Sequence, residues 1–111
     1  MSVVAEEKFG DIDLVASERS HKNEWTVEAY FPPSMRIVGV AEFAGVYEWD
    51  EEGERQLVAL KGWDVDVSPD FRRRGLATAM YALAERAFDL PIIPGDFQTP
   101  AGRAFLGRHK G

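Results

Sequence analysis

The sequence predicts an α+β fold, in which a mixed, mostly antiparallel sheet carries one long helix and is followed by a short strand and helix. The first two-thirds of the chain alternates apolar and polar residues with a period of two, as half-buried strands do. After residue 75 the period changes to that of an amphipathic helix. A run of strands that precedes the helix, without alternating with helices, indicates an α+β plan.

The size and composition of the chain predict one domain over residues 1–111. Hydrophobic residues make up 45% of its 111 residues and charged residues 29%, a balance typical of globular proteins. The chain contains no cysteine, which excludes disulfide scaffolds, cysteine-based metal clusters and thiol catalysis. No apolar run approaches the ~20 residues of a membrane span, and no signal-peptide pattern opens the chain. We therefore expect a soluble cytoplasmic protein.

Each predicted strand ends at a turn signal. We expect strands at residues 11–18, 25–31, 37–49 and 57–67, and turns at residues 20–23, 32–34 and 50–54. Gly39 and Gly45 predict bulges, or places where another group approaches the backbone closely. Four aromatic side chains fall at strand spacing and are expected to fill the core: Trp25, Phe43, Trp49 and Trp63.

The helix is predicted to begin near Gly75 and to end before Pro91, because proline disfavours the helical conformation of the residue before it. Ile92 and Ile93 form either a short strand or an extended linker. A second short helix is expected over residues 99–107, opened by Thr99 as N-cap. The apolar face of the first helix consists of Leu76, Met80, Leu83, Ala84, Ala87 and Phe88.

The charge distribution predicts where ligands would bind. The formal net charge is −6, from 19 acidic and 13 basic residues, and such a surface repels nucleic acid. Acids dominate up to Asp70, whereas the chain is basic from Arg72 onward. An anionic ligand is therefore expected in the C-terminal half. No metal site is expected, because His21 and His109 lack a third nitrogen or sulfur ligand.

Three consecutive arginines, Arg72, Arg73 and Arg74, stand where the last long strand gives way to the helix. The helix dipole already places positive charge at this end, so the arginines indicate an anion that the helix N-terminus binds. Alternatively, Ser68 and Pro69 are themselves an N-cap signature. In that case the helix begins there and the arginines lie on its solvated first turn.

The segment VSPDFRRRGLA at residues 67–77 resembles the acyl-CoA-binding motif of the GNAT superfamily of N-acetyltransferases. That motif is Gln or Arg, two residues, Gly, one residue, then Gly or Ala, and Arg72, Gly75 and Ala77 stand at its three defining positions. The resemblance covers roughly residues 25–106. Residues 98–105 are also similar to the tail of small GNAT-like proteins of actinobacteria and their phages, a minimal form of the fold.

The resemblance implies transfer of an acetyl group from acetyl-CoA to a primary amine, by direct attack in a ternary complex. The amides of residues 73–78 would wrap the CoA diphosphate, and the backbone at residues 65–67 would pair with pantetheine as an added strand. An N–H of the same strand would stabilise the developing oxyanion. The implied cofactor-binding residues are Val65, Val67, Arg72, Arg73, Arg74, Gly75, Leu76, Ala77 and Thr78.

The general base is sought on the strand before the motif, because in the family that strand commonly supplies it. The usual sites are near Lys61 and Trp63, and neither residue is a base of the expected kind. Asp64 is the first candidate, followed by Asp66 and Glu42, since a carboxylate in a cleft can take a proton from an amine. The alternative for each is a solvated acid on the exposed face of a sheet. Glu28 is a further candidate.

The proton donor for the departing thiolate also differs from the family pattern. Many relatives use a tyrosine in the last helix, where this chain has Phe105, so His109, Thr99 or water would serve instead. The helices that usually help to shape the acceptor pocket are replaced by the loop at residues 19–24. The partner subunit of a homodimer would complete such a pocket.

The resemblance leaves two functions open. The acidic surface suits a cationic acceptor, either a small molecule such as a polyamine or an aminoglycoside-like compound, or a protein lysine. The alternative is a non-catalytic protein, phage-encoded or regulatory, that keeps the fold and contacts a protein partner. The shortened acceptor side favours the alternative, and the Arg72–Gly75–Ala77 pattern favours the enzyme.

Overall fold

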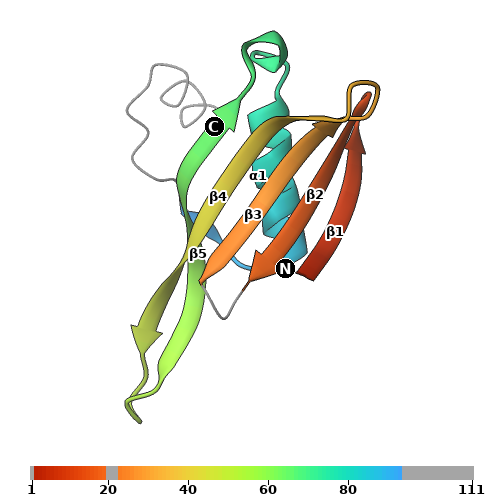
Figure 1. Ribbon diagram of the computed structural model, residues 1–111. Coiled ribbons are helices and arrows are strands. Elements are labelled where there is room, and N and C mark those ends of the chain that lie inside the picture. Colours follow the sequence, from red (N-terminus) through yellow and green to blue (C-terminus); the bar gives the residue numbers. More distant parts are fainter. Residues whose placement is uncertain (1, 20–22, 94–111) are drawn as a thin grey trace.

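The computed structural model describes residues 2–19 and 23–93, which form one sheet and one α-helix around a shared core (Figure 1). The strands are β1 (Ser2–Phe9), β2 (Ile12–Arg19), β3 (Glu24–Phe31), β4 (Arg36–Trp49), β5 (Arg55–Val67) and β6 (Ile92–Ile93), and the helices are the 3-10 turn η2 (Pro69–Phe71) and α1 (Leu76–Phe88). The strands follow the order β1-β2-β3-β4-β5-β6 across the sheet. Each neighbouring pair is antiparallel except β5 and β6, which are parallel.

The predicted strands are confirmed, and the structure adds β1, which the sequence analysis missed. Six of the eight residues of β1 are exposed, so the strand lacks the apolar alternation that identifies a half-buried strand. Tertiary pairing stabilises β1 instead, because it forms an antiparallel ladder with β2 from Ser2 to Phe9. The turn between the two strands contains Gly10, whose φ of 63° favours glycine.

The helix α1 begins at Leu76, as predicted, and ends at Phe88. Ser68 precedes the short turn η2 and does not begin α1, so the arginines lie in a loop and not on the first helical turn. The helix follows β5, which lies beside the short edge strand β6 and not at the centre of the sheet. Ile92 and Ile93 form a strand, whereas the helix predicted over residues 99–107 lies outside the described residues.

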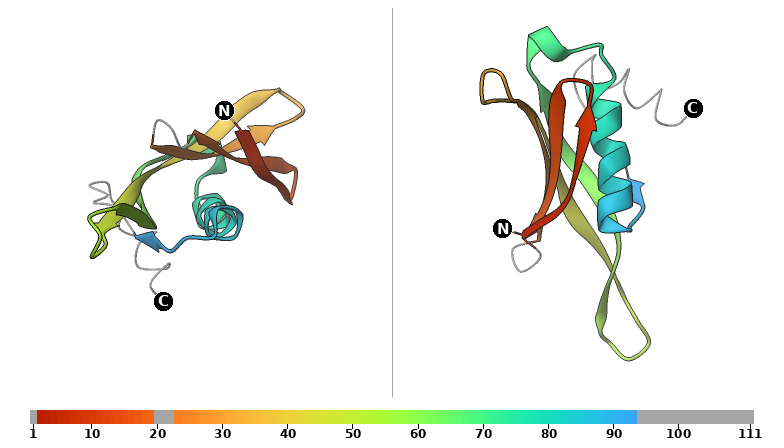
Figure 2. Two further views of the ribbon diagram at one scale, coloured as in Figure 1. Left: turned by 90° about the horizontal axis from the view of Figure 1, so that it is seen from below. Right: turned by 90° about the vertical axis from the view of Figure 1, so that its right-hand side faces the viewer.

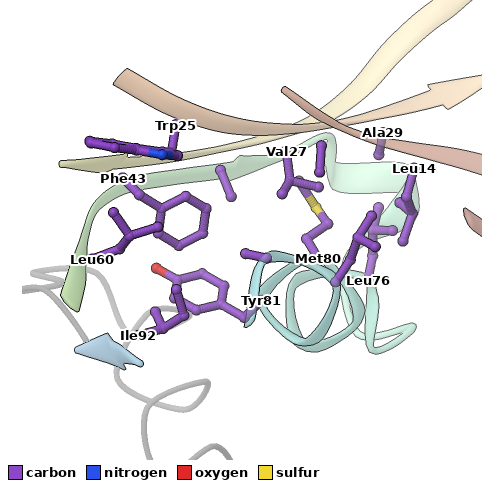
Figure 3. Packing of buried hydrophobic residues seen from close by; sticks show 14 of the residues in the cluster. Leu14, Trp25, Val27, Ala29, Phe43, Leu60, Leu76, Met80, Tyr81 and Ile92 are labelled. Carbon is purple, nitrogen blue, oxygen red and sulfur yellow. The ribbon is translucent and has the colours of Figure 1, made fainter. Parts of the chain in front are cut away.

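The core lies between the sheet and α1, which covers one face of the sheet (Figure 2). Tyr81 packs edge-on against Phe43 with ring centroids 5.0 Å apart, and Figure 3 shows its ring near Leu60 and Ile92. The predicted helix face omitted Tyr81, although its side chain is fully buried. Its position is at the margin of the predicted apolar stripe, and from there its long ring reaches Gly62 on β5.

The prediction that four aromatic residues fill the core is correct for two of them. Trp25 and Phe43 are buried, but Trp49 is 73% exposed and Trp63 is 62% exposed. Trp49 lies on the part of β4 that extends past β3, where α1 does not reach. Trp63 is the extra residue of a bulge, because Phe43 pairs with Gly62 while the preceding residue of β4 pairs with Asp64.

The two strand glycines that the sequence singled out are both sites of close approach. A Cβ on Gly39 would lie 3.3 Å from the Met80 sulfur and 3.5 Å from a Leu76 methyl carbon, so glycine lets α1 pack directly on β4. Gly45 donates its N–H to Asn23 Oδ1 across 3.1 Å. The ladder of β4 with β3 is also irregular beside Gly39, where Ala29 pairs with Gly39 and the next residue of β3 pairs with Ile37.

Gly62 is the glycine at which a side chain would be most disruptive. A Cβ there would overlap the Tyr81 hydroxyl oxygen and lie 3.0 and 3.1 Å from two carbons of the same ring. We expect Gly62→Ala to lower the free energy of unfolding by about 1–3 kcal/mol, because overpacking forces the neighbours apart. Chemical denaturation measures this change. The double variant Gly62→Ala/Tyr81→Phe should recover part of the loss, and a Gly62→Ala variant as stable as the parent would contradict the packing.

The turn between β4 and β5 is ordered by the carboxylate of Asp50. Its Oδ1 accepts hydrogen bonds from the backbone N–H groups of Glu52 and Glu54 at 2.9 and 2.8 Å. Its Oδ2 accepts one from the Gln56 side chain at 3.1 Å. The hydrogen bond from the Glu54 backbone, followed by that from Gln56, lowers the pKa of Asp50 below its usual value of 3.8.

A carboxyl group with a lowered pKa stabilises the folded turn above its usual pKa, and that stabilisation is lost as the pH falls through the lowered value. We therefore expect the amide chemical shifts of Glu52 and Glu54 to titrate with a midpoint below 3.8. Two-dimensional NMR between neutral and strongly acidic pH measures it. In the matched variant Asp50→Asn this titration should disappear, and a midpoint at or above the usual value would contradict the bonding.

Candidate functional site

The loop that joins β5 to α1 is held in place at both of its ends. Ser68 donates its N–H to the Val38 carbonyl oxygen at 2.8 Å, which extends the pairing of β4 and β5 by one residue. Phe71 in η2 packs against Phe31 with ring centroids 5.4 Å apart. The loop is therefore anchored to the sheet before the chain reaches the arginines.

Each of the three predicted arginines is exposed and occupies a different place in this loop. Arg72 donates its Nε to the Val67 carbonyl oxygen at 3.0 Å, so its guanidinium folds back over the end of β5. The Arg74 guanidinium lies 5.0 Å from the centroid of the Phe71 ring, a cation–π distance. None of the three lies within ion-pair distance of a carboxylate in residues 2–19 and 23–93.

The backbone around Arg73 and Gly75 adopts an unusual conformation. Arg73 has a φ of 64° and Gly75 a φ of 78°, so two left-handed residues stand within one short loop. Such a conformation costs a non-glycine residue about 1–2 kcal/mol. Strain of this kind tends to collect at functional sites, where turned backbone amides form a concavity for an anion.

The N-terminus of α1 presents backbone amides that the helix does not use. The first intrahelical bond joins the N–H of Ala79 to the carbonyl oxygen of Gly75. The amides of Leu76, Ala77 and Thr78 precede it and have no intrahelical acceptor. No side chain caps this end and its first turn has no acidic residue. The dipole, the amides and the arginines together favour a negatively charged ligand.

The strand that leads into this loop has a free edge over its last residues. The parallel strand β6 pairs only with Leu60 and Lys61, and Leu60 donates its N–H to the Pro91 carbonyl oxygen at 2.9 Å. Residues 62–67 pair with β4 on one side and with no described strand on the other. This stretch includes the predicted residues Val65 and Val67, whose side chains face α1. Apart from the Val67 carbonyl oxygen, which accepts the hydrogen bond from Arg72, their backbone is open to an extended ligand that lies between β5 and β6.

The predicted base residues lie on the face of the sheet opposite α1. Residues directly opposite each other in a ladder share a face, and Glu42 is directly opposite Asp64. Asp66 is opposite Val40, which in turn faces Glu28 on β3. No described element covers this face (Figure 2). The structure therefore brings the candidates of three adjacent strands together, which their separation in the sequence did not reveal.

A β-bulge lies beside the candidate bases on β5, and its extra residue is Trp63. The bulge does not turn Asp64 or Asp66 toward α1. Asp64 stays in register with Glu42, and both aspartates keep to the outer face of the sheet. On the inner face the Tyr81 ring packs against Gly62 at the same bulge. Burial, and to a lesser extent the negative charge of Asp64, raise the pKa of the Tyr81 hydroxyl. The sequence signal that could have identified Tyr81 is its place in the amphipathic helix, at the margin of the apolar face.

Several predicted features fall outside the described part of the chain. Thr99, Phe105 and His109, which bear on the proton donor, belong to residues 94–111. Within the described ranges, no three potential ligands among His, Cys, Asp and Glu come together in a way that could hold a metal ion. In those ranges, too, no helix combines the length and hydrophobicity that crossing a bilayer requires.

Comparison with known proteins identifies the architecture. The structure is similar to an acetyltransferase from Trypanosoma brucei, with a TM-score of 0.58 and 21% sequence identity over 83% of this chain and 63% of that one. It is also similar to AAC(6')-Iy, solved with a bisubstrate analogue of CoA and acetylneamine, with a TM-score of 0.58 and 15% identity over 80% and 61% of the two chains. The chain has the fold of the GNAT-type acetyltransferases.

A third match supports the same architecture. The aminoglycoside 6'-N-acetyltransferase AAC(6')-Ih from Acinetobacter baumannii aligns with a TM-score of 0.56 and 17% identity, over 80% of this chain and 62% of that one. This GNAT-like chain thus spans about three fifths of the length of these structures. The sequence itself matches no family model and no curated protein.

Proposed function

We propose that this GNAT-like domain is an N-acyltransferase, which transfers an acetyl group from acetyl-CoA to a primary amine in a ternary complex. The observation that supports this most directly is the junction of β5 and α1. There a strand with a free edge leads into a strained, arginine-rich loop, and the loop leads into an uncapped helix N-terminus. A ligand with an extended portion and a diphosphate group fits this arrangement, because the extended portion can pair with the strand edge and the diphosphate can bind at the loop and the helix N-terminus.

The loop would bind the diphosphate. In this proposal the amides from Arg73 to Thr78 donate to the diphosphate at the uncapped helix N-terminus, and the guanidinium groups of Arg72 and Arg74 in the same loop add positive charge. The bond from Arg72 to Val67 uses Nε alone, so the terminal nitrogens of that guanidinium can still donate to a phosphate oxygen. Gly75 has no side chain, which lets a phosphate approach the backbone there.

The free edge of β5 would orient the thioester. Pantetheine contains amide groups, which can pair with the backbone of Val65 to Val67 as an added strand does. The same pairing would place an N–H of β5 beside the carbonyl oxygen that becomes negatively charged during attack. Holding both reactants in this geometry contributes more to the rate than any single hydrogen bond.

The acceptor amine would approach from the sheet face opposite α1. A neutral amine nitrogen attacks the acyl carbon, the carbon–sulfur bond breaks, and the nitrogen loses a proton to a carboxylate or to an intervening water. Asp64 is our first choice for that carboxylate, because it lies on the outer face at the start of the free edge. Asp66, Glu42 and Glu28 share this face, and their charge favours a cationic acceptor.

The arginines of the loop provide a direct test of the diphosphate site. Acetyl-CoA and desulfo-CoA both contain the diphosphate, so each should stabilise the protein. At about 100-fold excess over Kd the gain is about 2.7 kcal/mol, which raises Tm by roughly 10 °C. The variant Arg72→Glu/Arg74→Glu should abolish both shifts in a thermal titration. Arg55→Glu/Arg86→Glu changes the charge equally elsewhere and should keep them. Retained affinity in the loop variant would refute the diphosphate site.

The candidate base Asp64 can be tested separately from cofactor binding. We expect Asp64→Asn to lower kcat by about 10²–10⁴-fold at neutral pH, because the amide cannot accept the proton of the amine. The acetyl-CoA thermal shift should be unchanged. Release of free CoA in a screen of polyamines, aminoglycosides and lysine peptides provides the assay. Asp13→Asn on β2 is the matched control, and full activity in Asp64→Asn would move the role to Asp66 or Glu42.

The non-catalytic alternative is favoured by one specific feature, the exposed Trp49 far from the loop. A domain that only contacts a partner needs such a surface and needs no acyl-CoA. The thermal titration separates the two functions, since a ligand that binds only the native state must stabilise it. If neither CoA compound shifts Tm, the fold serves binding alone.

A further inference from the structure

The strands β4 and β5 extend past the rest of the sheet as a two-stranded arm (Figure 1). The ladder of β4 with β3 ends at Phe43, and β6 reaches only Leu60 and Lys61. Among the described residues, positions 44–49 therefore pair only with β5, and positions 55–59 pair only with β4. We call residues 44–59 the arm. At about 3.3 Å per residue it projects about 20 Å beyond the neighbouring strands.

An aromatic surface lies on this arm. Trp49 is 73% exposed and stands directly opposite Arg55 near the tip. The Arg55 guanidinium lies 4.1 Å from the centroid of the Tyr47 ring. Tyr47 and Trp49 are two residues apart, so they share one face of the arm. A large exposed aromatic side chain that contributes nothing to the core is typical of a surface that binds a partner.

The arm is clasped at both ends, which gives it a defined shape. At its base, Asn23 Oδ1 accepts hydrogen bonds from the Gly45 N–H at 3.1 Å and from the Tyr47 hydroxyl at 2.8 Å. At its tip, the Asp50 carboxylate holds the turn. A two-stranded hairpin on its own is marginally stable in water, and these contacts support it. An ordered surface loses little conformational entropy when it binds.

One edge of the arm presents unpaired backbone groups. The Gly45 N–H points away from β5, because its acceptor is Asn23. Backbone groups two residues apart along a strand point to the same edge, so the N–H and carbonyl groups of Tyr47 and Trp49 face that side too. No described strand pairs with them. Such an edge is a template for a further strand.

The charge around this edge determines which partner it accepts. Residues 48–55 contain five carboxylates and one guanidinium: Glu48, Asp50, Glu51, Glu52, Glu54 and Arg55. An extended segment that carries lysine or arginine would meet opposite charge along the arm. A cationic side chain can also lie against the exposed face of an indole ring. Anionic partners, which include nucleic acid and acidic lipid surfaces, would be repelled.

We propose that the arm is a docking site for an extended polypeptide segment rich in lysine and arginine. The segment adds as a strand along the Tyr47–Trp49 edge of β4 and places a cationic side chain against Trp49. Backbone hydrogen bonds supply the alignment, and the carboxylates select the charge of the partner. This surface lies apart from the loop at Arg72 and does not depend on acyl transfer.

Fluorescence polarisation with a labelled synthetic peptide tests the proposal. The peptide alternates lysine or arginine with threonine or valine and is long enough to span the edge. We expect saturable binding at physiological ionic strength, which Trp49→Ala weakens about 10-fold or more because the aromatic anchor is lost. Trp63→Ala removes another exposed tryptophan, which lies outside the arm, and should leave the affinity unchanged. A peptide with glutamate at the basic positions should not bind.

A second peptide separates strand addition from simple charge attraction. It has the same sequence but is N-methylated at alternate residues, so it keeps its charge and cannot pair with the edge. We expect its affinity to be at least about 10-fold weaker. Equal affinity of the two peptides, unchanged binding by Trp49→Ala, or no binding by the parent would each overturn the proposal. The acetyl-CoA thermal shift of Trp49→Ala should be unaltered, so this test fails or succeeds independently of the acyltransferase proposal.

Discussion

The two edges of β5 have different partners, and the candidate site depends on that difference. One edge pairs with β4 along nearly its whole length, whereas the other meets β6 only at Leu60 and Lys61. A strand that is paired on one edge and unpaired on the other can bind an extended ligand while keeping its position in the sheet. The bulge at Trp63 and the packing of Tyr81 on Gly62 lie where the pairing with β6 ends.

The loop after β5 combines repulsion between positive charges with backbone strain, and a bound anion would reduce that repulsion. Three guanidinium groups stand near the positive end of the helix dipole, and Arg73 is held in a left-handed conformation. The surrounding packing maintains this arrangement, through Phe71 on Phe31 and through the bond from Arg72 to Val67. A site built in this way is preorganised, since little has to move when charge arrives.

The same sheet separates three surfaces by charge and by place. The arginines lie at the end of β5 that enters α1, the acidic candidates lie on the face opposite α1, and the arm with Trp49 extends beyond both. Because opposite charges occupy different surfaces, an anionic cofactor and cationic partners would not compete for one position. The short sheet edge at β6 and the uncovered outer face follow from the same topology.

The sequence by itself determined where the four longer strands and the helix lie along the chain, because these depend on local periodicity and turn chemistry. It left open whether the helix begins near Gly75 or at Ser68, and the structure places the arginines in a loop before the helix. Tertiary structure alone decided the rest. The strand β1 forms through its partner β2 and not through its own pattern. The juxtaposition of Glu42 with Asp64 requires the register of two strands, and the exposure of Trp49 requires knowing where β3 ends. Register and strand length are properties of pairs of segments, so no single segment encodes them.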